Sequence, residues 1–229
     1  IPVIEVADLR TSATSDALAS YAPDAICVSC FPWRLPTAIL RLPRLGCLNV
    51  HPALLPDTRG PDPLFWTFHR GDATTGVTIH LMDEGLDSGP ILLQESIFVP
   101  DGITELLLER TCAEVGSRLL VQALAALASG AAQPQPQDET RAIRYPLPTS
   151  DDYHITPDRP ARWAYNFASG LIGRGQPILI AAPGATFHLL ALLGYADDET
   201  LAFPWRLDGE LLALRCAPGV FRARVARLR

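Results

Sequence analysis

The chain has 229 residues, 48% of them hydrophobic, and a formal net charge of −6 at pH 7. Such a chain is long and apolar enough to bury one good core and a smaller second unit, which excludes a disordered protein. All 19 basic residues are Arg, so mechanisms that need a lysine Schiff base or a lysine nucleophile are excluded. The net acidity argues against broad affinity for nucleic acid, although a local arginine patch is compatible with it.

Cysteine usage and the distribution of apolar residues predict a soluble cytoplasmic protein. Cys27 and Cys30 form a CxxC pair, but they fall in a strand-like run, where residues three apart point to opposite faces. No second pair follows at zinc-site spacing, so we predict no metal and buried, reduced thiols. We also expect no membrane contact, because neither a signal peptide nor an apolar run of transmembrane length is apparent. The five cysteines are Cys27, Cys30, Cys47, Cys112 and Cys216.

Short apolar runs alternate with helix-forming runs in the first 100 residues. Residues 25–30 form a continuous apolar run, which is typical of a central strand in a sheet covered on both faces. The alternation of strand, helix and strand predicts a parallel α/β sheet. Predicted strands cover residues 2–6, 25–30, 48–51, 75–82 and 91–99, and predicted helices cover residues 16–21, 37–42 and 63–70.

A long helix, a linker and a β-rich unit are predicted for the rest of the chain. The helix is capped by Asp101 or Thr104, carries apolar residues at helical spacing and stops at Gly130. Prolines and glutamines indicate a linker at residues 131–159. Residues 160–229 are expected to form a small, mainly β, barrel-like domain, because a short helix at 161–168 precedes runs at 177–182, 186–193, 201–205, 211–216 and 220–225.

Three polar residues occupy positions that a fold rarely gives to polar side chains. Asn49 and His51 alternate with Leu48 and Val50, so an amide and an imidazole leave one strand on the same face. Asp87 follows a second alternating run, and two strand ends can bring the three together. A nearby carboxylate makes an imidazole easier to protonate, and it can help carry a proton away from an attacking nucleophile. The imidazole and the amide together can stabilise a developing oxyanion. Singly, each residue also fits a bland role as a turn cap, a satisfied surface imidazole or an Asx turn.

Several motifs around these residues occur in a recognisable order. They are NVHPALLP at residues 49–56, RG at 59–60, TGVTI at 75–79 and DEGLDSG at 83–89. With this order and spacing the chain resembles the family of 10-formyltetrahydrofolate-dependent formyltransferases, which includes methionyl-tRNA formyltransferases and sugar N-formyltransferases. The resemblance implies an α/β formyltransferase fold with a Rossmann-like, mostly parallel sheet, in which residues 1–130 form the catalytic domain.

The resemblance also implies a division of labour among the three polar residues. A primary amine attacks the formyl group carried by 10-formyltetrahydrofolate, the formyl donor. Asn49 and a protonated His51 support the resulting oxyanion, while Asp87 holds the imidazole and assists proton transfer. Methionyl-tRNA and an amino sugar or nucleotide sugar are the implied acceptors.

A binding site for the folate cosubstrate is implied as well. Residues that follow the strand at 25–30 would wall the pterin pocket, although a buried aromatic plug is the alternative. Arg59 would either orient the substrate or only tie its loop down. The implied cofactor-binding residues are Phe31, Trp33, Leu35, Leu54, Asp83, Glu84, Gly85 and Leu86.

Two further features of the central motifs bear on acid and base chemistry. His80 lies on a strand face with Thr78, and we expect it to be structural rather than catalytic. Asp83, Glu84 and Asp87 crowd one loop, and their mutual repulsion is expected to raise the pKa of at least one of them, unless solvent relieves it.

The chain also departs from the family pattern in ways that affect function. Family members open with a strand, a helix and a strand ahead of residues matching 1–6, which this sequence does not show. Either a segment ahead of residue 1 has been left out of the sequence, or this is a shortened relative whose substrate site is rebuilt or lost. A non-catalytic folate-binding or regulatory protein, or a hydrolase of the formyl donor, is therefore the alternative function, and an oligomer is possible. The aromatic run at residues 63–66 and the acidity shift the expected acceptor toward an amino sugar. The arginines of the tail could touch phosphate or form a solvated edge: Arg222, Arg224, Arg227 and Arg229.

Overall fold

The computed structural model describes residues 3–31 and 33–228. The chain forms two compact units, each built from several stretches of sequence. The first unit contains Ile1–Pro63, Thr75–Ile97 and Thr111–Pro146, and the second contains Leu64–Thr74, Phe98–Arg110 and Leu147–Arg229. This division differs from the expected boundaries, because most of the segment taken for a linker stays with the first unit and two earlier stretches join the C-terminal strands.

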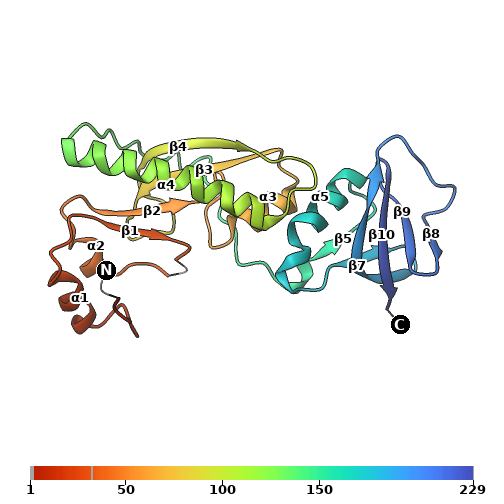
Figure 1. Cartoon of the computed structure of the whole chain (residues 1–229), viewed down its shortest axis with the longest axis horizontal. Coiled ribbons are helices and arrows are strands. Elements are labelled where there is room, and N and C mark those ends of the chain that lie inside the picture. Colours follow the sequence, from red (N-terminus) through yellow and green to blue (C-terminus); the bar gives the residue numbers. More distant parts are fainter. Residues whose placement is uncertain (1–2, 32, 229) are drawn as a thin grey trace. The chain divides into compact units, whose positions relative to one another are not determined.

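A four-stranded sheet forms the centre of the first unit (Figure 1). The strands lie in the order β1-β2-β3-β4, and β1 pairs with β2 in parallel while β2 pairs with β3 antiparallel. The predicted α/β class is confirmed, and the antiparallel pair makes the sheet a mixed one. The strands are β1 (Ile26–Ser29), β2 (Cys47–His51), β3 (Thr74–Leu81) and β4 (Ile91–Phe98).

Helix α4 (Glu105–Ser129) runs across one face of this sheet (Figure 1). Gly116 allows a close approach, because a Cβ there would lie 2.6 Å from Val50 Cγ1 and 3.5 Å from Val77 Cγ1. Val50 and Val77 therefore face the helix, and the residues that alternate with them in β2 and β3 face the opposite side. Helical spacing correctly predicted its most buried apolar residues, which are Leu108, Cys112, Leu119 and Ala123.

By length and apolar composition alone, α4 would be able to cross a bilayer, a test that the core helices of globular proteins also pass. This run was not predicted from sequence to be of transmembrane length. In the first unit the helix is tied to the sheet, because Arg118 pairs with Glu95 of β4 at 2.6 Å and Gly116 packs on β2. The absence of membrane contact stays a prediction.

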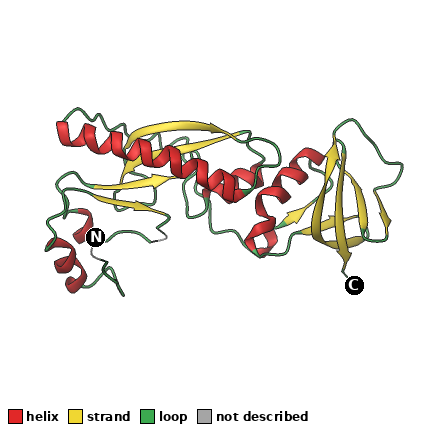
Figure 2. Ribbon diagram, viewed as in Figure 1, coloured by secondary structure: helices red, strands yellow, loops and turns green. Residues whose placement is uncertain are grey.

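The second unit contains a six-stranded sheet in the order β5-β6-β7-β10-β9-β8, which confirms the mainly β C-terminal region. Only the β5 and β6 pairing is parallel among its strand pairs in the described part of the chain. Helix α5 lies beside these strands (Figure 2). The elements are α3 (Pro63–Arg70), β5 (His154–Ile155), α5 (Ala161–Leu171), β6 (Leu179–Ala182), β7 (Ala185–Ala196), β8 (Trp205–Asp208), β9 (Leu211–Arg215) and β10 (Val220–Arg227), with 3-10 turns at Ser150–Asp152 and Ile172–Arg174.

Aromatic packing between α3 and α5 builds the core of the second unit. The Phe65 and Phe167 ring centroids lie 6.4 Å apart, edge to face, and a Cβ on Gly170 would lie 2.4 Å from Phe68 Cδ1. Leu64, Phe65 and Trp66 are all buried. The aromatic run at residues 63–66 therefore packs in the core of the second unit, and the acceptor expected from this run stays a prediction.

Several local predictions were wrong at the edges of elements. Residues 3–6 form no strand, and Pro2 lies outside the described residues. The first helix, α1 (Ser12–Ala19), begins earlier than expected, because the Thr11 side chain accepts a hydrogen bond from Thr14 N and caps it. The strand expected at 201–205 begins only at Trp205. Helix α2 (Thr37–Leu40) lies where a helix was predicted.

The cysteines divide into two groups. Cys47, Cys112 and Cys216 are buried free thiols, as predicted, and burial raises the pKa of Cys47 and of Cys216 to about 11. Cys27 and Cys30 are exposed, which contradicts the prediction for this pair. The apolar neighbours of this pair in sequence did not ensure burial, because the run forms a short strand with alternating exposure.

Candidate functional site

Strands β2 and β3 bring polar side chains together on the face of the sheet opposite α4. Their antiparallel register pairs Asn49 with His80 and His51 with Thr78. Residues paired across two strands point to the same face, so two polar positions of each strand face one side. Val50 and Val77, which alternate with them, face the helix. The polar face is thus a consequence of period-two alternation in both strands.

The loop after β3 folds back and adds Asp87 to this group. Asn49 Nδ2 donates a hydrogen bond to Asp87 Oδ1 at 3.3 Å. The same oxygen lies 3.8 Å from His51 Nδ1 and 3.8 Å from His80 Nε2. The structure therefore brings the three predicted catalytic residues together and adds a second imidazole, from His80, to them.

The surroundings of His51 fix the tautomer of its ring. Its Nε2 lies 2.7 Å from the carbonyl oxygen of Thr58, which can only accept, so Nε2 carries the hydrogen. In the neutral ring the lone pair of Nδ1 then faces Asp87. Burial lowers the pKa of His51 and outweighs the Asp87 charge and the Thr58 carbonyl, which raise it. Burial thus opposes the easily protonated His51 that was expected, while the Asp87 charge acts in the expected direction.

Asp87 is held as a carboxylate although only 10% of its side chain is exposed. Burial favours the neutral acid, but the pKa of Asp87 is lowered because His80, His51 and the backbone N–H of Gly60 lie near its oxygens. Gly60 N donates to Asp87 Oδ2 at 2.9 Å. The crowding of acidic residues was expected to raise a pKa in this loop, and for Asp87 the shift has the opposite sign, with Asn49 Nδ2 and Gly60 N donating to its two oxygens.

His80 is a functional candidate that was expected from sequence to be structural. It is 1% exposed, and its Nδ1 lies 2.9 Å from the carbonyl oxygen of Leu81, so Nδ1 carries the hydrogen. Its Nε2 is then free to accept, and it lies 3.2 Å from Asn49 Nδ2. His80 thus orients the amide of Asn49. Alternation along β3 had already placed His80 on the polar face, and pairing that face with Asn49 would have found it.

The residues expected to wall the folate pocket have different surroundings. Trp33 is 66% exposed and lines a hollow of about 570 Å³ together with residues 6–10. Phe31 packs edge to face against Trp33 at 5.5 Å between ring centroids. Leu35 is buried in a core cluster with Ile39 and Cys47, so it supports the wall from behind rather than lining it.

The remaining expected folate-binding residues belong to two loops. Leu54 lies over β3, since a Cβ on Gly76 would be 2.4 Å from Leu54 Cδ2. Asp83 Oδ1 accepts hydrogen bonds from Gly85 N at 2.9 Å and Ser88 Oγ at 2.8 Å, which closes the turn at Gly85. Glu84 accepts a hydrogen bond from Thr37 Oγ1 at 2.8 Å. Leu86, the residue before Asp87 in the same loop, is half-buried.

Arg59 is fully buried, with 0% of its side chain exposed. Its guanidinium donates to Glu139 Oε1 at 2.7 Å and to Gln137 Oε1 at 2.8 Å. Both partners belong to residues 135–145, a segment that we call the strap. Of the two roles expected for Arg59, these bonds favour tying the loop down over touching a substrate.

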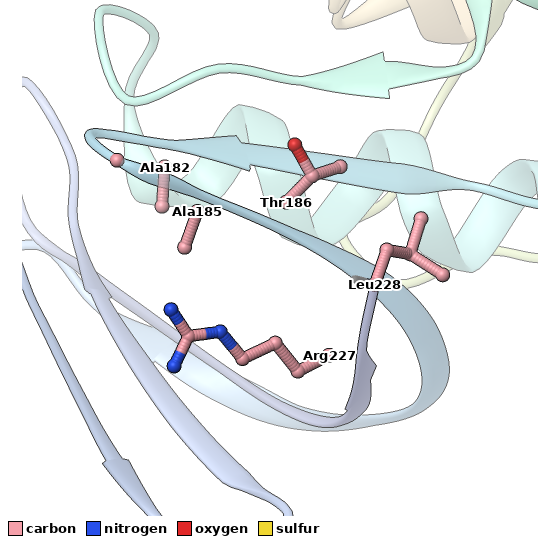
Figure 3. Close-up of a pocket in the computed structure, with 6 residues that line it drawn as sticks. Ala182, Ala185, Thr186, Arg227 and Leu228 are labelled. Carbon is pink, nitrogen blue, oxygen red and sulfur yellow. The ribbon is translucent and has the colours of Figure 1, made fainter.

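A second hollow, of about 760 Å³, lies at one end of the C-terminal strands (Figure 3). Figure 3 shows the Arg227 side chain extending along it, and the guanidinium lies 5.8 Å from the Trp205 ring centroid. Its other lining residues are small or apolar and none belongs to the group around Asp87: Ala182, Gly184, Ala185, Thr186 and Leu228. Among residues 3–31 and 33–228, no group of three or more His, Cys, Asp and Glu side chains is arranged to hold a metal ion.

Comparison with known proteins gives this geometry a context. A family model described as formyl transferase matches residues 4–124. The methionyl-tRNA formyltransferase of Pelobacter propionicus is 40% identical over 171 residues, which cover 75% of this chain and 54% of that protein. The methionyl-tRNA formyltransferase of Acidobacterium capsulatum is 38% identical over 221 residues, which cover 96% of this chain and 71% of that protein.

A solved structure shows the same fold. The methionyl-tRNA formyltransferase from Clostridium thermocellum matches with a TM-score of 0.61 at 18% identity, over 94% of this chain and 82% of that chain. The chain spans about half the length of the first of the curated relatives that it matches.

Proposed function

This chain belongs to the formyl transferase family, and from that premise we propose that it transfers a formyl group from 10-formyltetrahydrofolate to the amine of methionyl-tRNA. One observation carries the proposal. Asn49, His51 and Asp87 converge within 3.3 to 3.8 Å on a buried face of the sheet. A fold gains little from burying an amide, an imidazole and a carboxylate there, since each must be desolvated and paired. Their convergence is better explained by chemistry.

The reaction moves one proton while one C–N bond replaces another. The amine nitrogen bonds to the formyl carbon, negative charge develops on the formyl oxygen, and the bond from that carbon to folate N10 breaks. Asn49 Nδ2 is the donor placed to stabilise the developing charge. His51 Nδ1, unprotonated at rest, accepts the proton of the attacking amine and returns it to N10.

Asp87 supports this proton transfer from its place beside His51. Protonation turns His51 into a cation in a buried site, where an unpaired charge is unfavourable. The Asp87 carboxylate, with Oδ1 3.8 Å from His51 Nδ1, stabilises that cation. The assignment differs from the one made on the resemblance, in which a protonated His51 stabilises the oxyanion, because burial lowers the pKa of His51.

The proposed place for the folate cosubstrate is the hollow near the end of β1, which is lined by apolar residues and by the charged Asp8, Arg10 and Arg34. Trp33 offers an exposed indole beside a hollow of about 570 Å³, a size within the range of small-molecule sites. Phe31 stiffens that wall through its edge-to-face contact, and Leu35 anchors it to the core. Leu54 and the turn at residues 83–86 are the remaining candidate contacts, the turn through its backbone groups.

Methionyl-tRNA is favoured as acceptor over an amino sugar by two observations. The relatives that match most of this chain are named methionyl-tRNA formyltransferases. In addition, Arg206, Arg222 and Arg224 share the outer face of β8, β9 and β10, since Arg206 and Arg222 both pair with Ala213 and Arg224 lies two residues on. Arg222 is paired with Glu199 on this face, and the exposed Arg206 and Arg224 suit contact with phosphates. This face is called the arginine face below.

Formyl transfer by the purified protein tests the proposal directly. We expect formylmethionyl-tRNA to form from 10-formyltetrahydrofolate, and Asp87→Asn and His51→Gln to lower kcat by about a hundredfold or more, as for loss of a proton-transfer group. Asp198→Asn and His154→Gln are matched controls outside the group around Asp87, and they should keep the wild-type rate.

Other outcomes would replace this function with a different one. Release of formate without any formylated amine would identify a hydrolase of the formyl donor. Tight folate binding with no transfer to methionyl-tRNA or to amino sugars would identify a non-catalytic binding protein. Transfer to an amino sugar alone would keep the chemistry and change the acceptor.

A further inference from the structure

The strap at residues 135–145 is bonded to the first unit at both of its ends. Near its start, Gln135 N donates to the Ile91 carbonyl and Ile91 N donates to the Gln135 carbonyl, both at 2.8 Å. Near its end, Arg59 N donates to the Ile143 carbonyl and Tyr145 N donates to the Arg59 carbonyl, both at 2.9 Å. The strap is thus an ordered part of the first unit, although its prolines and glutamines predicted a linker.

Gln137 makes four hydrogen bonds from the middle of the strap. Its Nε2 donates to the Asp87 carbonyl at 2.8 Å and to the Gly89 carbonyl at 2.7 Å. Its Oε1 accepts from Arg59 Nε at 3.1 Å and from Arg59 Nη2 at 2.8 Å. Both ends of the amide are used, so its orientation is fixed: acceptor toward the buried guanidinium and donor toward the loop that carries Asp87.

The Asp87 loop has a backbone that needs such support. Asp87 adopts a positive φ of 53°, which is unfavourable for a residue with a side chain unless neighbours hold it. Gly89 follows in a turn so tight that a Cβ would lie 1.9 Å from the Leu81 carbonyl oxygen. The carbonyls of Asp87 and Gly89 are the two that Gln137 binds.

The same strap also binds the loop that follows His51, at residues 52–60. Ile143 N donates to the Pro56 carbonyl at 3.2 Å, and a Cβ on Gly60 would lie 2.2 Å from the Tyr145 carbonyl oxygen. This loop supplies the Thr58 carbonyl that fixes the His51 tautomer and the Gly60 N–H that binds Asp87. The strap therefore contacts both loops whose backbone groups orient the two side chains.

We propose that Gln137 is a positioning residue for Asp87, with the buried Arg59 holding Gln137 in turn. The proposal rests on the formyl transfer proposed above. Gln137 fixes the main chain of Asp87 so that its carboxylate stays beside His51 Nδ1, and Arg59 fixes the amide that does so. Glu139 completes the arrangement by pairing with Arg59 at 2.7 Å.

Two substitutions of Gln137 separate positioning from simple attachment of the strap. Gln137→Glu keeps an acceptor for Arg59 but replaces the N–H donors with an oxygen facing two carbonyls. Gln137→Met keeps the length without adding charge. Gln133→Ala, in an exposed side chain just before the strap, is the matched control.

Kinetics provide the first measurement. For Gln137→Glu we expect kcat to fall about tenfold or more, with the KM for 10-formyltetrahydrofolate within about twofold of wild type and Tm close to that of the control. A wild-type kcat in Gln137→Glu would overturn the proposal, because attachment through Arg59 would then be sufficient. An equal loss in kcat and folate affinity would also overturn it, since that would indicate a disordered loop rather than a misplaced carboxylate.

Imidazole titration by NMR gives a second measurement that does not depend on activity. The Asp87 charge raises the pKa of His51, so a displaced carboxylate should let that pKa fall. We expect a lower His51 pKa in Gln137→Met than in wild type, and no change in Gln133→Ala. An unchanged pKa in Gln137→Met would contradict the proposal. Absence of formyl transfer by the wild type would instead contradict the proposed function, and the titration would still decide the role of Gln137.

Discussion

Polar residues have different surroundings in the two units of this protein. In the first unit, His51, His80 and Asp87 are at most 10% exposed at the side chain, and each has a defined partner. On the arginine face of the second unit, Arg206 and Arg224 are exposed. Desolvating the first group is unfavourable for folding, whereas the second group keeps most of its hydration.

This difference shows how the two regions are expected to respond to change. A buried, mutually oriented group depends on small changes in distance, so single substitutions there should act on the rate of chemistry. An exposed cationic face acts through summed charge, so substitutions there should act on binding and on its salt dependence. The following predictions test that contrast, beginning with the largest expected effect.

Substitution of His80 should impair the buried site without altering a proposed proton acceptor. In His80→Leu the Asn49 amide loses the imidazole nitrogen that accepts from it, and we expect kcat to fall about tenfold, less than the roughly hundredfold typical for removing an oxyanion donor. Single-turnover formyl transfer measures this effect. His80→Gln offers a replacement acceptor and should recover part of the rate.

A wild-type rate in His80→Leu would show that Asn49 is oriented without His80. Equal losses in both His80 variants, with a lowered Tm, would indicate that the imidazole serves packing alone. Either result would show that His80 does not act with His51 and Asp87 in the buried polar group of the first unit.

Charge reversal on the arginine face should change binding and spare the chemistry. For Arg206→Glu combined with Arg224→Glu, we expect the KM for methionyl-tRNA to rise about tenfold. The slope of log affinity against log salt should become shallower by about one for each phosphate that the variant no longer neutralises. Transfer to a small amine at saturating concentration should not change. Arg44→Glu is a control outside this face, because Arg44 is paired with Asp24 at 2.9 Å.

An unchanged salt slope in the double variant would assign the arginine face to solvent rather than to phosphate. Arg224 would then belong to a solvated edge, the alternative that the sequence leaves open. The contrast between the units would remain, but the acceptor would have to be recognised elsewhere.

The smallest predicted effect concerns the protonation of His51. Burial lowers its pKa below the ordinary value of about 6.5, and the Asp87 charge opposes that shift. In Asp87→Asn the opposing charge is lost, so the pKa of His51 should fall further, which imidazole NMR can measure. A rise in this variant would show that the carboxylate does not act on His51.

The same shift fixes the sign of a stability effect. Below about pH 6.5 the unfolded chain binds a proton at residue 51 that the folded protein resists, so the free energy of unfolding contributed by His51 decreases as the pH falls through this window. Asp87 acts at lower pH: its folded pKa is depressed, so its contribution is present above about pH 3.9 and is lost as the pH falls toward the folded pKa. Denaturant titration of wild type against His51→Gln isolates the first effect.

Local sequence patterns and motifs predicted most of the fold and most of the candidate site. Alternation predicted β2 and β3 correctly and helical spacing predicted α4, while the resemblance to formyltransferases singled out Asn49, His51 and Asp87 as a set. The position of His80 beside Asn49 depends on antiparallel pairing of β2 with β3, which alternation within one strand does not specify. Gln137 was missed for a similar reason, since glutamines between prolines are typical of linkers and only tertiary contacts order them here.

The boundaries between units were the least predictable feature. Helix α3 was found correctly from its sequence, but its aromatics pack on α5, about 100 residues later in the chain, and no local signal records that. The absence of a strand at residues 3–6 has the same origin, because a strand forms only where a neighbour supplies its ladder partners.

The amide of Asn49 has a consequence for how substrate and protein compete. Both of its N–H groups are directed at partners within the protein, His80 Nε2 and Asp87 Oδ1. The oxygen of a planar formyl group carries little charge, so it competes weakly with the Asp87 carboxylate for one of those hydrogens. The fully charged oxygen of the adduct would compete strongly for that hydrogen. In the proposed reaction, Asn49 would therefore bind the adduct more tightly than the formyl group that enters the site.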